Sequence, residues 1–423
     1  MEESTQTSDI PITPRSGWAQ TFASLHYPNF RLLWISTIFI SGGNWIQQVT
    51  IGWLAYEMAE PEIAPLQVAI VLGLRAFPML FSPVAGVIAD RFDRRRAFMT
   101  NQAWLAALAI GFAAVLLLDI TQMWHLYVFS FLAGAGWALN NPLRQTLVSN
   151  AVPRESLMNA IALHSMAFNS MRMVGPAAGG AFIALFGPGV NFLIQACLYV
   201  GVFVMLLPFR PIYAEARRVI AQSPFADLLE GLRYVKGHRI TLLTILLSLA
   251  PTLFMMSFIM TQMPVYNGAV LGGGEVLLGW LMTAMGVGGF TGTLIMARFN
   301  RIRHKGRVIL IGITGAGIGM LGLSQTDVLW QVIPLLMFQQ VFFMTVMMTN
   351  NTVLQTITPD SMRGRVMGVY MMDIGMQPLG GLIAGLIATA YSVSVAWVFG
   401  ATVGLLVMVL VAIFAPSFRR LEL

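Results

Sequence analysis

Charged residues and cysteine are scarce in this 423-residue chain. Only 10% of its residues are Asp, Glu, Lys or Arg, whereas soluble domains usually carry about 25%. Its single cysteine, Cys197, excludes an intramolecular disulfide and a cysteine-based metal centre. In place of charge the chain is 57% hydrophobic, with a mean hydropathy of +0.73. This composition argues against a soluble protein.

Motifs of soluble enzymes are missing as well. The loop Gly-x-x-x-x-Gly-Lys-Ser/Thr does not occur, so direct use of ATP is not expected. The net charge of +7 does not indicate nucleic acid, because the basic residues are spread over many short connections. The 28 methionines suit apolar packing surfaces better than a copper site. We therefore expect no enzyme, no cofactor, no metal site and no nucleic-acid partner.

Long apolar runs dominate the sequence. About twelve runs approach or exceed the roughly 20 residues of a membrane-spanning helix, and they occupy 32–58, 65–89, 97–118, 123–147, 157–185, 189–208, 240–266, 276–297, 307–325, 329–350, 364–390 and 393–415. Their continuity favours helices over the alternating strands of a β-barrel. The sequence predicts an all-α integral membrane protein with twelve transmembrane helices.

Lysine and arginine are absent from every second connection between these runs. The connections without them are 59–64, 119–122, 186–188, 267–275, 326–328 and 391–392. Basic connections stay in the cytoplasm during membrane insertion, so both termini are predicted to be cytoplasmic. Residues 1–30 are polar and lack the apolar segment of a cleavable signal peptide.

The two halves of the chain repeat each other. Asn141-Pro-Leu-Arg-Gln145-Thr146 matches Asn351-Thr-Val-Leu-Gln355-Thr356, and Pro176-Ala-Ala-Gly179-Gly180 matches Pro378-Leu-Gly380-Gly381. Such duplication indicates two pseudo-symmetric six-helix bundles with a binding site between them. The predicted organisation is a cytoplasmic tail (1–30), a first bundle (31–208), a cytoplasmic linker (209–239), a second bundle (240–415) and a second tail (416–423).

Three ionisable residues lie deep inside apolar runs: Arg75, Arg172 and Asp373. At about 1.5 Å of rise per residue, all three fall near the membrane centre, where a charge is costly and marks a pathway or a pair. We expect one of the arginines to contact an anionic group of a substrate. Asp373 is expected to pair with an arginine or to bind a proton. Alternatively, each arginine satisfies backbone carbonyls and supports the helix packing.

Polar residues share helix faces with these charges. The faces comprise Ser165, Asn169 and Arg172 in the fifth run, Asn44, Gln47 and Gln48 in the first run, and Asp373 and Gln377 in the eleventh run. Each face lines either a substrate cavity or a helix contact. Three faces at similar depth favour a cavity.

Several motifs resemble the major facilitator superfamily. Gly86-Val-Ile-Ala-Asp90-Arg91-Phe-Asp-Arg94-Arg95 is similar to that superfamily's motif Gly-x-x-x-Asp-Arg-x-x-Arg-Arg. Gly175-Pro176-Ala-Ala-Gly179-Gly180 is similar to the antiporter motif of its drug exporters, although Met171 stands where glycine is common. Trp45-Ile-Gln-Gln48, Asp227-Leu-Leu-Glu-Gly-Leu-Arg233 and Pro359-Asp-Ser-Met-Arg363-Gly-Arg365 resemble the enterobactin-exporter-like proteins, also called transmembrane secretion effectors.

The resemblance, which covers about residues 25–420, implies a role for the first motif. Asp90, Arg91, Arg94 and Arg95 would form a cytoplasmic latch against the eleventh helix, which begins near Arg363. The alternative is a solvated turn with weak surface ion pairs. The second half has no acid at the matching position, so such a latch is one-sided. The antiporter-like motif is interpreted either as a hinge or as simple close packing.

The resemblance also implies a major facilitator fold in a bacterial inner membrane. The implied function is proton-coupled export of a small organic molecule such as a siderophore, an anionic metabolite or a drug. The partners are then the substrate, protons and membrane lipids, and the protein is expected to act as a monomer. A non-transporting sensor or receptor, and an importer or uniporter of a small metabolite, are the alternatives.

Overall fold

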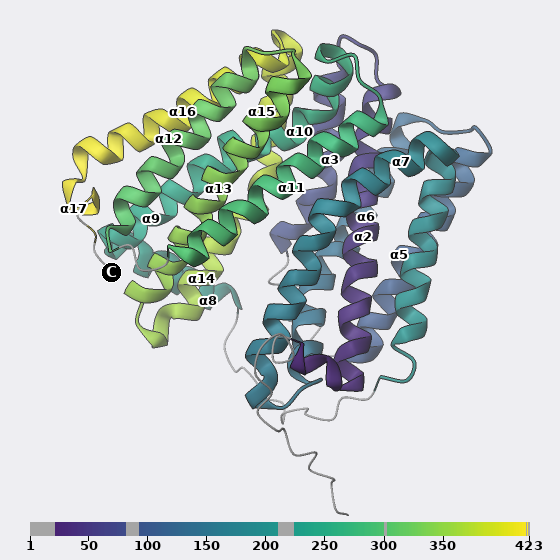
Figure 1. The fold of residues 1–423 in the computed structure, drawn as a ribbon, viewed down its shortest axis with the longest axis horizontal. Coiled ribbons are helices and arrows are strands. Elements are labelled where there is room, and N and C mark those ends of the chain that lie inside the picture. Colours follow the sequence, from purple (N-terminus) through teal and green to yellow (C-terminus); the bar gives the residue numbers. More distant parts are fainter. Residues whose placement is uncertain (1–21, 82–92, 210–223, 300–302, 420, 422–423) are drawn as a thin grey trace, which may run out of the picture.

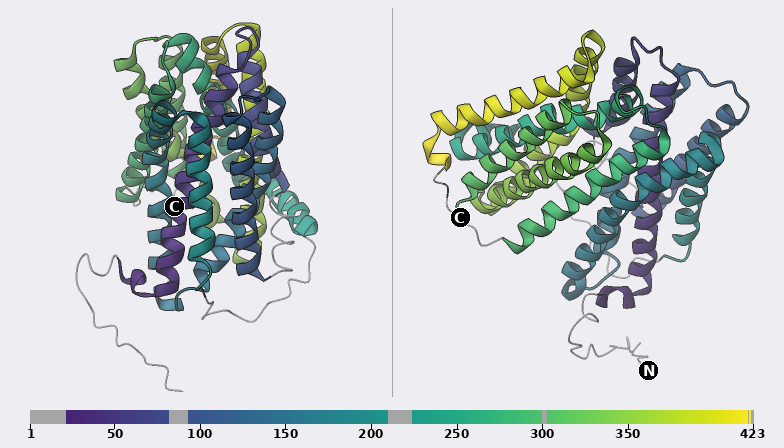
Figure 2. Two further views of the ribbon diagram at one scale, coloured as in Figure 1. Left: turned by 90° about the vertical axis from the view of Figure 1, so that its right-hand side faces the viewer. Right: turned by 45° about the horizontal axis from the view of Figure 1, so that its top comes forward.

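A computed structural model describes residues 22–81, 93–209, 224–299, 303–419 and 421. These residues form helices and their connections, with no β-strand among them. The helices form two groups that lean together at one end and separate toward the other (Figure 1, Figure 2). The predicted all-α architecture is confirmed.

The first group contains the helices of the N-terminal half of the chain. They are η1 (Ala23–His26), α2 (Pro28–Glu57), α3 (Ala64–Ala76) with the 3-10 turn η2 (Phe77–Phe81), α5 (Arg94–Leu117), α6 (Met123–Ser149), η3 (Arg154–Ser156) and α7 (Leu157–Met205). α7 covers two of the predicted apolar runs. It bends at Gly187, whose φ of 77° and ψ of 164° are readily adopted only by glycine.

The second group begins after the short helix α8 (Pro224–Gly237). Its members are α9 (Arg239–Ala250), the π-helical segment η4 (Pro251–Met256), α10 (Ser257–Val265), the π-helical segment η5 (Tyr266–Val270), α11 (Glu275–Arg298), α12 (Lys305–Ser324), α13 (Leu329–Ile357), α14 (Asp360–Gly375), α15 (Gln377–Ala390), α16 (Val393–Phe414) and α17 (Pro416–Arg419). The predicted run 364–390 is therefore interrupted at Met376.

Nine helical segments of the described residues are long and apolar enough to cross a membrane. One of them, Arg154–Met205, has 52 residues, which is enough for two crossings because one needs about 20. α2 and α6 are not among the nine, although they have 30 and 27 residues. Both are rich in polar side chains, which lower the mean hydropathy. The helices make this a multi-pass membrane protein.

The groups are joined mainly where α7 packs on α11 and α3 packs on α15, with smaller contacts of α10 with α2 and α3, of α11 with α2, and of α14 with η2. Glycine permits the close approach. A Cβ atom on Gly180 would lie 2.4 Å from the carbonyl oxygen of Glu275, and one on Gly385 would lie 2.5 Å from the Cβ of Ala69. Both contacts lie near the starts of α11 and α3, where the groups meet in Figure 1.

Candidate functional site

Three amide side chains of α2 surround the guanidinium group of Arg75. Its Nε donates to Gln47 Oε1 at 3.2 Å, and its two terminal nitrogens donate to Gln48 Oε1 and Asn44 Oδ1. In the described part of the chain Arg75 takes part in no ion pair. Neutral amide dipoles therefore hold this positive charge. The structure thus brings together four of the predicted pathway residues.

Local geometry explains this cage of amides around Arg75. Residues 44, 47 and 48 are spaced by three and four positions, so they share one face of α2. α3 ends at Ala76 and continues as a 3-10 turn that contains Pro78. On the other side, Gly134 of α6 lets α3 approach closely, because a Cβ there would lie 2.0 Å from the carbonyl oxygen of Arg75. Arg75 is thereby pressed toward α2.

Arg172 has a different environment, on α7 where the two groups of helices meet. A Cβ built on Gly289 of α11 would lie 3.6 Å from Cζ of Arg172 and 3.4 Å from Cγ of Met344. Among the described residues, no hydrogen-bond or ion-pair partner contacts the guanidinium group. The side chain is partly exposed. Its donors therefore have no protein acceptor among the described residues in this conformation.

Asp373 lies in the second group, and its carboxylate contacts a hydroxyl group. Its Oδ2 accepts a hydrogen bond from Ser248 Oγ of α9, and only 6% of the residue is exposed. Nearby, Tyr370 donates to the carbonyl oxygen of Met347 at 3.3 Å. No ion pair joins Asp373 to either deep arginine among the described residues. Both expected roles of Asp373, pairing with an arginine and binding a proton, stay predictions, and in this conformation its carboxylate contacts Ser248.

Irregular backbone lies next to these ionisable residues. The π-helical segment η4 begins three residues after Ser248, and the α14–α15 break at Met376 separates Asp373 from Gln377. The end of α14 contacts the 3-10 turn η2 that follows α3, because a Cβ on Gly375 would lie 2.9 Å from a methyl carbon of Leu80 in η2. Interrupted helices at membrane depth occur where the backbone is buried in protein or lines a cavity. In transporters they mark the binding region.

The break at Met376 falls within the predicted polar face of the eleventh run, which stays a prediction. Gln377 is the first residue of α15 and is partly buried. The helix boundary at Met376 lies between Asp373 and Gln377. On α7, Asn169 donates to the carbonyl oxygen of Ser165 at 2.8 Å, so this amide is engaged within its own helix. Ser165 itself is exposed.

The antiporter-like motif packs against two different helices. A Cβ on Gly175 would lie 2.7 Å from Cβ of Trp45, and one on Gly179 would lie 3.1 Å from Cα of Ile46, both on α2. Gly180 faces α11 of the other group instead. The motif therefore sits between a neighbour in its own half and a neighbour in the other half. Close packing is evident at this motif, and the hinge interpretation stays a prediction.

Pro176 adds a further contact between the groups. Because proline has no N–H, it cannot donate to the carbonyl oxygen of Arg172 one turn earlier. That carbonyl faces Gly286 of α11, where a Cβ would lie 2.5 Å away. The N–H of Ala177 donates to Thr283 Oγ1 of α11 at 3.1 Å. α7 nevertheless stays helical here and has its non-helical residue at Gly187.

Of the predicted latch, Asp90 and Arg91 lie outside the described residues. Arg94 is the first residue of α5 and is half-buried. Arg95 donates from Nε to the carbonyl oxygen of Leu206 at 3.0 Å and from a terminal nitrogen to that of the following residue. These bonds join α5 to the end of α7 within the first group. A latch role for Arg95 stays a prediction.

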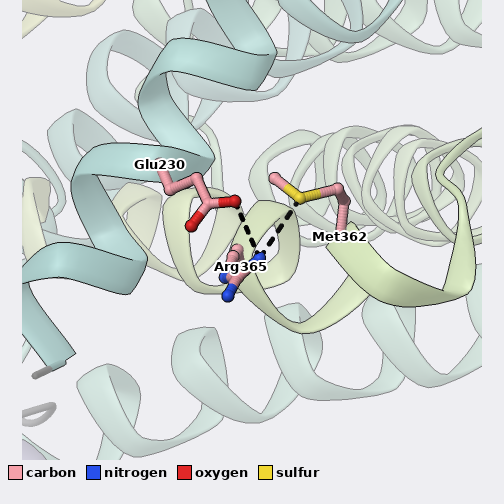
Figure 3. Close-up of polar contacts among 3 residues, drawn as sticks. All are labelled: Glu230, Met362 and Arg365. Atoms are coloured by element: carbon pink, nitrogen blue, oxygen red, sulfur yellow. Dashed lines mark hydrogen bonds and ion pairs between the residues drawn. The ribbon is translucent and has the colours of Figure 1, made fainter. Parts of the chain in front are cut away.

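Near the start of α14, two arginines have different acidic partners. Arg363 pairs with Asp360 of its own helix at 2.5 Å, and both side chains are exposed. Arg365 donates to Glu230 Oε1 of α8 at 2.9 Å and to the sulfur of Met362 at 3.4 Å (Figure 3). In this conformation Arg363 therefore contacts its own helix, and the neighbouring Arg365 holds α8.

Ser248 was missed by the sequence-based prediction. A signal was present, because Thr244, Ser248 and Thr252 recur every four residues within the run 240–266. Hydroxyl groups at this spacing share a helix face. Thr252 donates to the sulfur of Met347 at 3.7 Å, so this face reaches the surroundings of Asp373.

Comparison with known proteins agrees with this arrangement. The family model for transmembrane secretion effectors matches residues 19–421. The staphyloferrin A transporter of Staphylococcus aureus is 28% identical over 370 residues, which cover 83% of this chain and 87% of that protein. The multidrug efflux pump Tap of Mycolicibacterium fortuitum is 27% identical over 406 residues, which cover 93% and 97%. The enterobactin exporter EntS of Shigella flexneri is 25% identical over 355 residues, or 80% of each chain.

Solved structures share the fold at lower identity. The nucleoside transporter NupG superposes with a TM-score of 0.72 at 12% identity, covering 92% of this chain and 100% of that one. A bacterial homologue of the human lysosomal transporter Spinster gives 0.68 at 13% identity, covering 96% and 97%. With the family match over nearly the whole length, the chain belongs to the transmembrane secretion effector family of the major facilitator superfamily and is a membrane transporter, not an enzyme.

Proposed function

We propose that the protein is a secondary active transporter that exports a small organic anion by alternating access. In this proposal twelve transmembrane helices form two pseudo-symmetric six-helix bundles, residues 31–208 and 240–415, joined by the cytoplasmic linker 209–239. The tails 1–30 and 416–423 are then cytoplasmic. Relatives named for staphyloferrin A transport, enterobactin export and multidrug efflux support export of a small organic molecule.

Helix lengths support the twelve crossings. α2 with 30 residues and α6 with 27 residues would be about 45 Å and 40 Å long, which exceeds the roughly 30 Å of hydrocarbon in a bilayer. α7 supplies two crossings on either side of the bend at Gly187. α2, α6 and the second crossing of α7 add three crossings to the nine apolar segments and make twelve. With twelve crossings, the alternation of basic and non-basic connections places both termini in the cytoplasm.

The contacts between the bundles support alternating access. They include the end opposite to the proposed cytoplasmic tails, where Gly180 meets Glu275 and Gln262 donates to the carbonyl oxygen of Pro65 at 3.3 Å. With the termini in the cytoplasm, this conformation faces inward. An exporter takes up its substrate in such a state.

The environment of Arg172 is the observation that carries the proposal. A buried arginine is normally surrounded by acceptors, as Arg75 is by three amides. Arg172 has no such partner among the described residues and lies between the bundles beside Gly289. A substrate carboxylate or another anionic group would supply the missing acceptors in a bidentate geometry. Arg75 then acts as a positioning residue.

Asp373 is the proposed proton carrier. Among the described residues it is the buried acidic residue, only 6% exposed, and its hydrogen-bond partner is the neutral Ser248. A charge without a cation at this depth is costly, and a proton removes that cost. Proton movement down its gradient through Asp373 would drive export.

The test compares small molecules inside and outside cells with and without the gene, followed by transport of the identified compound in proteoliposomes. Arg172→Gln is expected to reduce transport of an anionic substrate about tenfold or more, since hydrogen bonds to charged groups contribute about 1.5–3 kcal/mol. Arg303→Gln, at an exposed residue, is the matched control. Undiminished transport by Arg172→Gln would refute the anion site. Asp373→Asn should abolish dependence on an imposed pH gradient.

A further inference from the structure

One side of α8 is anchored to α14. Glu230 Oε1 accepts from Arg365 at 2.9 Å, as Figure 3 shows. Gly231 lets the helices approach, because a Cβ there would lie 2.7 Å from the carbonyl oxygen of Arg365. Val235 is 4% exposed and belongs to the same apolar cluster as Val369 of α14. This side of α8 therefore packs against α14.

The other side of α8 is exposed and has a distinct composition. Leu229 is 50% exposed and Leu232 is 42% exposed. Arg233 and Lys236 are exposed as well, and neither forms an ion pair in the described part of the chain. Positions 229, 232, 233 and 236 are separated by three, four and seven residues, so they share one helix face. We refer to these four residues as the α8 outer face.

The position of α8 brings this face to the membrane surface. α8 leads through His238 directly into the membrane helix α9, whose first turn closes with a hydrogen bond from Leu242 N–H to the carbonyl oxygen of His238 at 2.9 Å. In Figure 1, α8 lies beside α14 at the end where the helix groups are apart. A helix at this place with leucines and cations on one face matches the chemistry of a bilayer interface. Apolar side chains enter the boundary between head groups and acyl chains, and cations meet lipid phosphates.

We propose that the α8 outer face binds anionic phospholipid of the cytoplasmic leaflet. A soluble anion would match Arg233 and Lys236 but would leave Leu229 and Leu232 in water. An anionic lipid satisfies both pairs of side chains. The inference uses the proposed cytoplasmic position of the linker and is independent of the identity of the substrate.

Lipid binding to the α8 outer face would affect the surroundings of Asp373 through the helices α14 and α9. α8 contacts α14 at Arg365, eight residues or about 12 Å along the helix from Asp373. It is continuous with α9, which carries Ser248, the hydrogen-bond partner of Asp373. The Glu230–Arg365 ion pair is partly exposed, at 48% and 23%, and such pairs are weak alone. A lipid that holds α8 in place would stabilise the cytoplasmic ends of both helices.

The test uses the full-length protein in nanodiscs of phosphatidylcholine, with and without phosphatidylglycerol. Hydrogen–deuterium exchange of residues 224–237 reports on α8, and native mass spectrometry counts bound phosphatidylglycerol. Phosphatidylglycerol is expected to slow exchange in α8. The double variant Arg233→Gln/Lys236→Gln should lose about tenfold or more of the apparent phosphatidylglycerol affinity. The bound fraction should also fall at high salt.

The matched control is Arg303→Gln/Arg307→Gln, which removes two exposed charges from the same side of the protein. Leu229→Ser/Leu232→Ser tests the apolar contribution and should weaken binding without changing the net charge. Unchanged exchange in the other helices shows that the variants are folded. Equal loss in the control pair, or full protection by phosphatidylglycerol in the Arg233/Lys236 variant, would overturn the proposal. Neither readout requires a substrate, so its failure is distinct from failure of the proposed transport function.

Discussion

A single methyl group at Gly180 should shift the conformational balance of the transporter. A Cβ there would lie 2.4 Å from the carbonyl oxygen of Glu275 and 3.2 Å from Cα of Val276. Both atoms belong to the backbone of α11, so no side-chain rotation relieves the overlap. The helices would have to separate by about 1 Å to restore ordinary contact distances.

Two terms bear on this substitution, and only the first differs between conformations. Overpacking of this kind costs about 1–3 kcal/mol, and it acts only in conformations where α7 touches α11 at Gly180. Alanine improves helix propensity over glycine by up to about 1 kcal/mol, and it does so in every conformation. Because the propensity gain is common to all conformations, it cancels, and the conformation described here should lose about 1–3 kcal/mol relative to others, which is about a 5- to 150-fold change in population.

Distances between spin labels can measure this shift. Labels at Met158→Cys and Arg303→Cys, both exposed and in different helix groups, report the separation of the open end in a Cys197→Ala background. Gly180→Ala should move the distribution toward shorter distances. Gly111→Ala is the control, because nothing lies within 4 Å of a Cβ at that position. Identical distributions for the two variants would refute the reasoning, as would a shift toward longer distances in Gly180→Ala.

Two further predictions concern stability. Gln47→Leu removes the acceptor of Arg75 Nε and should lower the free energy of unfolding in detergent by about 1.5–3 kcal/mol. The control is Gln355→Leu at an exposed position. An equal loss of stability in both variants would contradict a structural role for the amides around Arg75. Gly187→Ala places a side chain at φ 77°, which should cost about 1–3 kcal/mol and lower the midpoint of thermal unfolding. An unchanged midpoint would show that α7 does not need this bend.

Much of the architecture could be predicted from local patterns. The apolar runs correspond closely to the helices, for example 329–350 to α13 and 393–415 to α16. Hydropathy suffices here because in a bilayer each helix satisfies its own backbone hydrogen bonds. The break at Met376 was not predicted, although Pro378 follows two residues later. It lies where Gly375 packs on Leu80, a residue almost three hundred positions away, and no local pattern reports such a contact.

The candidate site, too, was predictable only in part from the sequence. Helical spacing placed Asn44, Gln47 and Gln48 on one face, and their contact with Arg75 agrees with that prediction. The pairing of Asp373 with an arginine was one of two expectations, and the structure places Ser248 there instead. The periodicity of one helix reveals which residues share a face but not which helix that face meets.

The sequence by itself therefore determined that the chain is a helical membrane protein and placed Arg75, Arg172 and Asp373 within its apolar runs, because hydropathy and helical period are properties of neighbouring residues. Only the tertiary structure decided which arginine has side-chain acceptors among the described residues and which has none. Arg75 meets α2 across 28 residues of sequence, whereas Arg172 faces Gly289 across more than a hundred. These partners are set by which helices pack together, and that depends on the shape of whole helix surfaces rather than on any single segment.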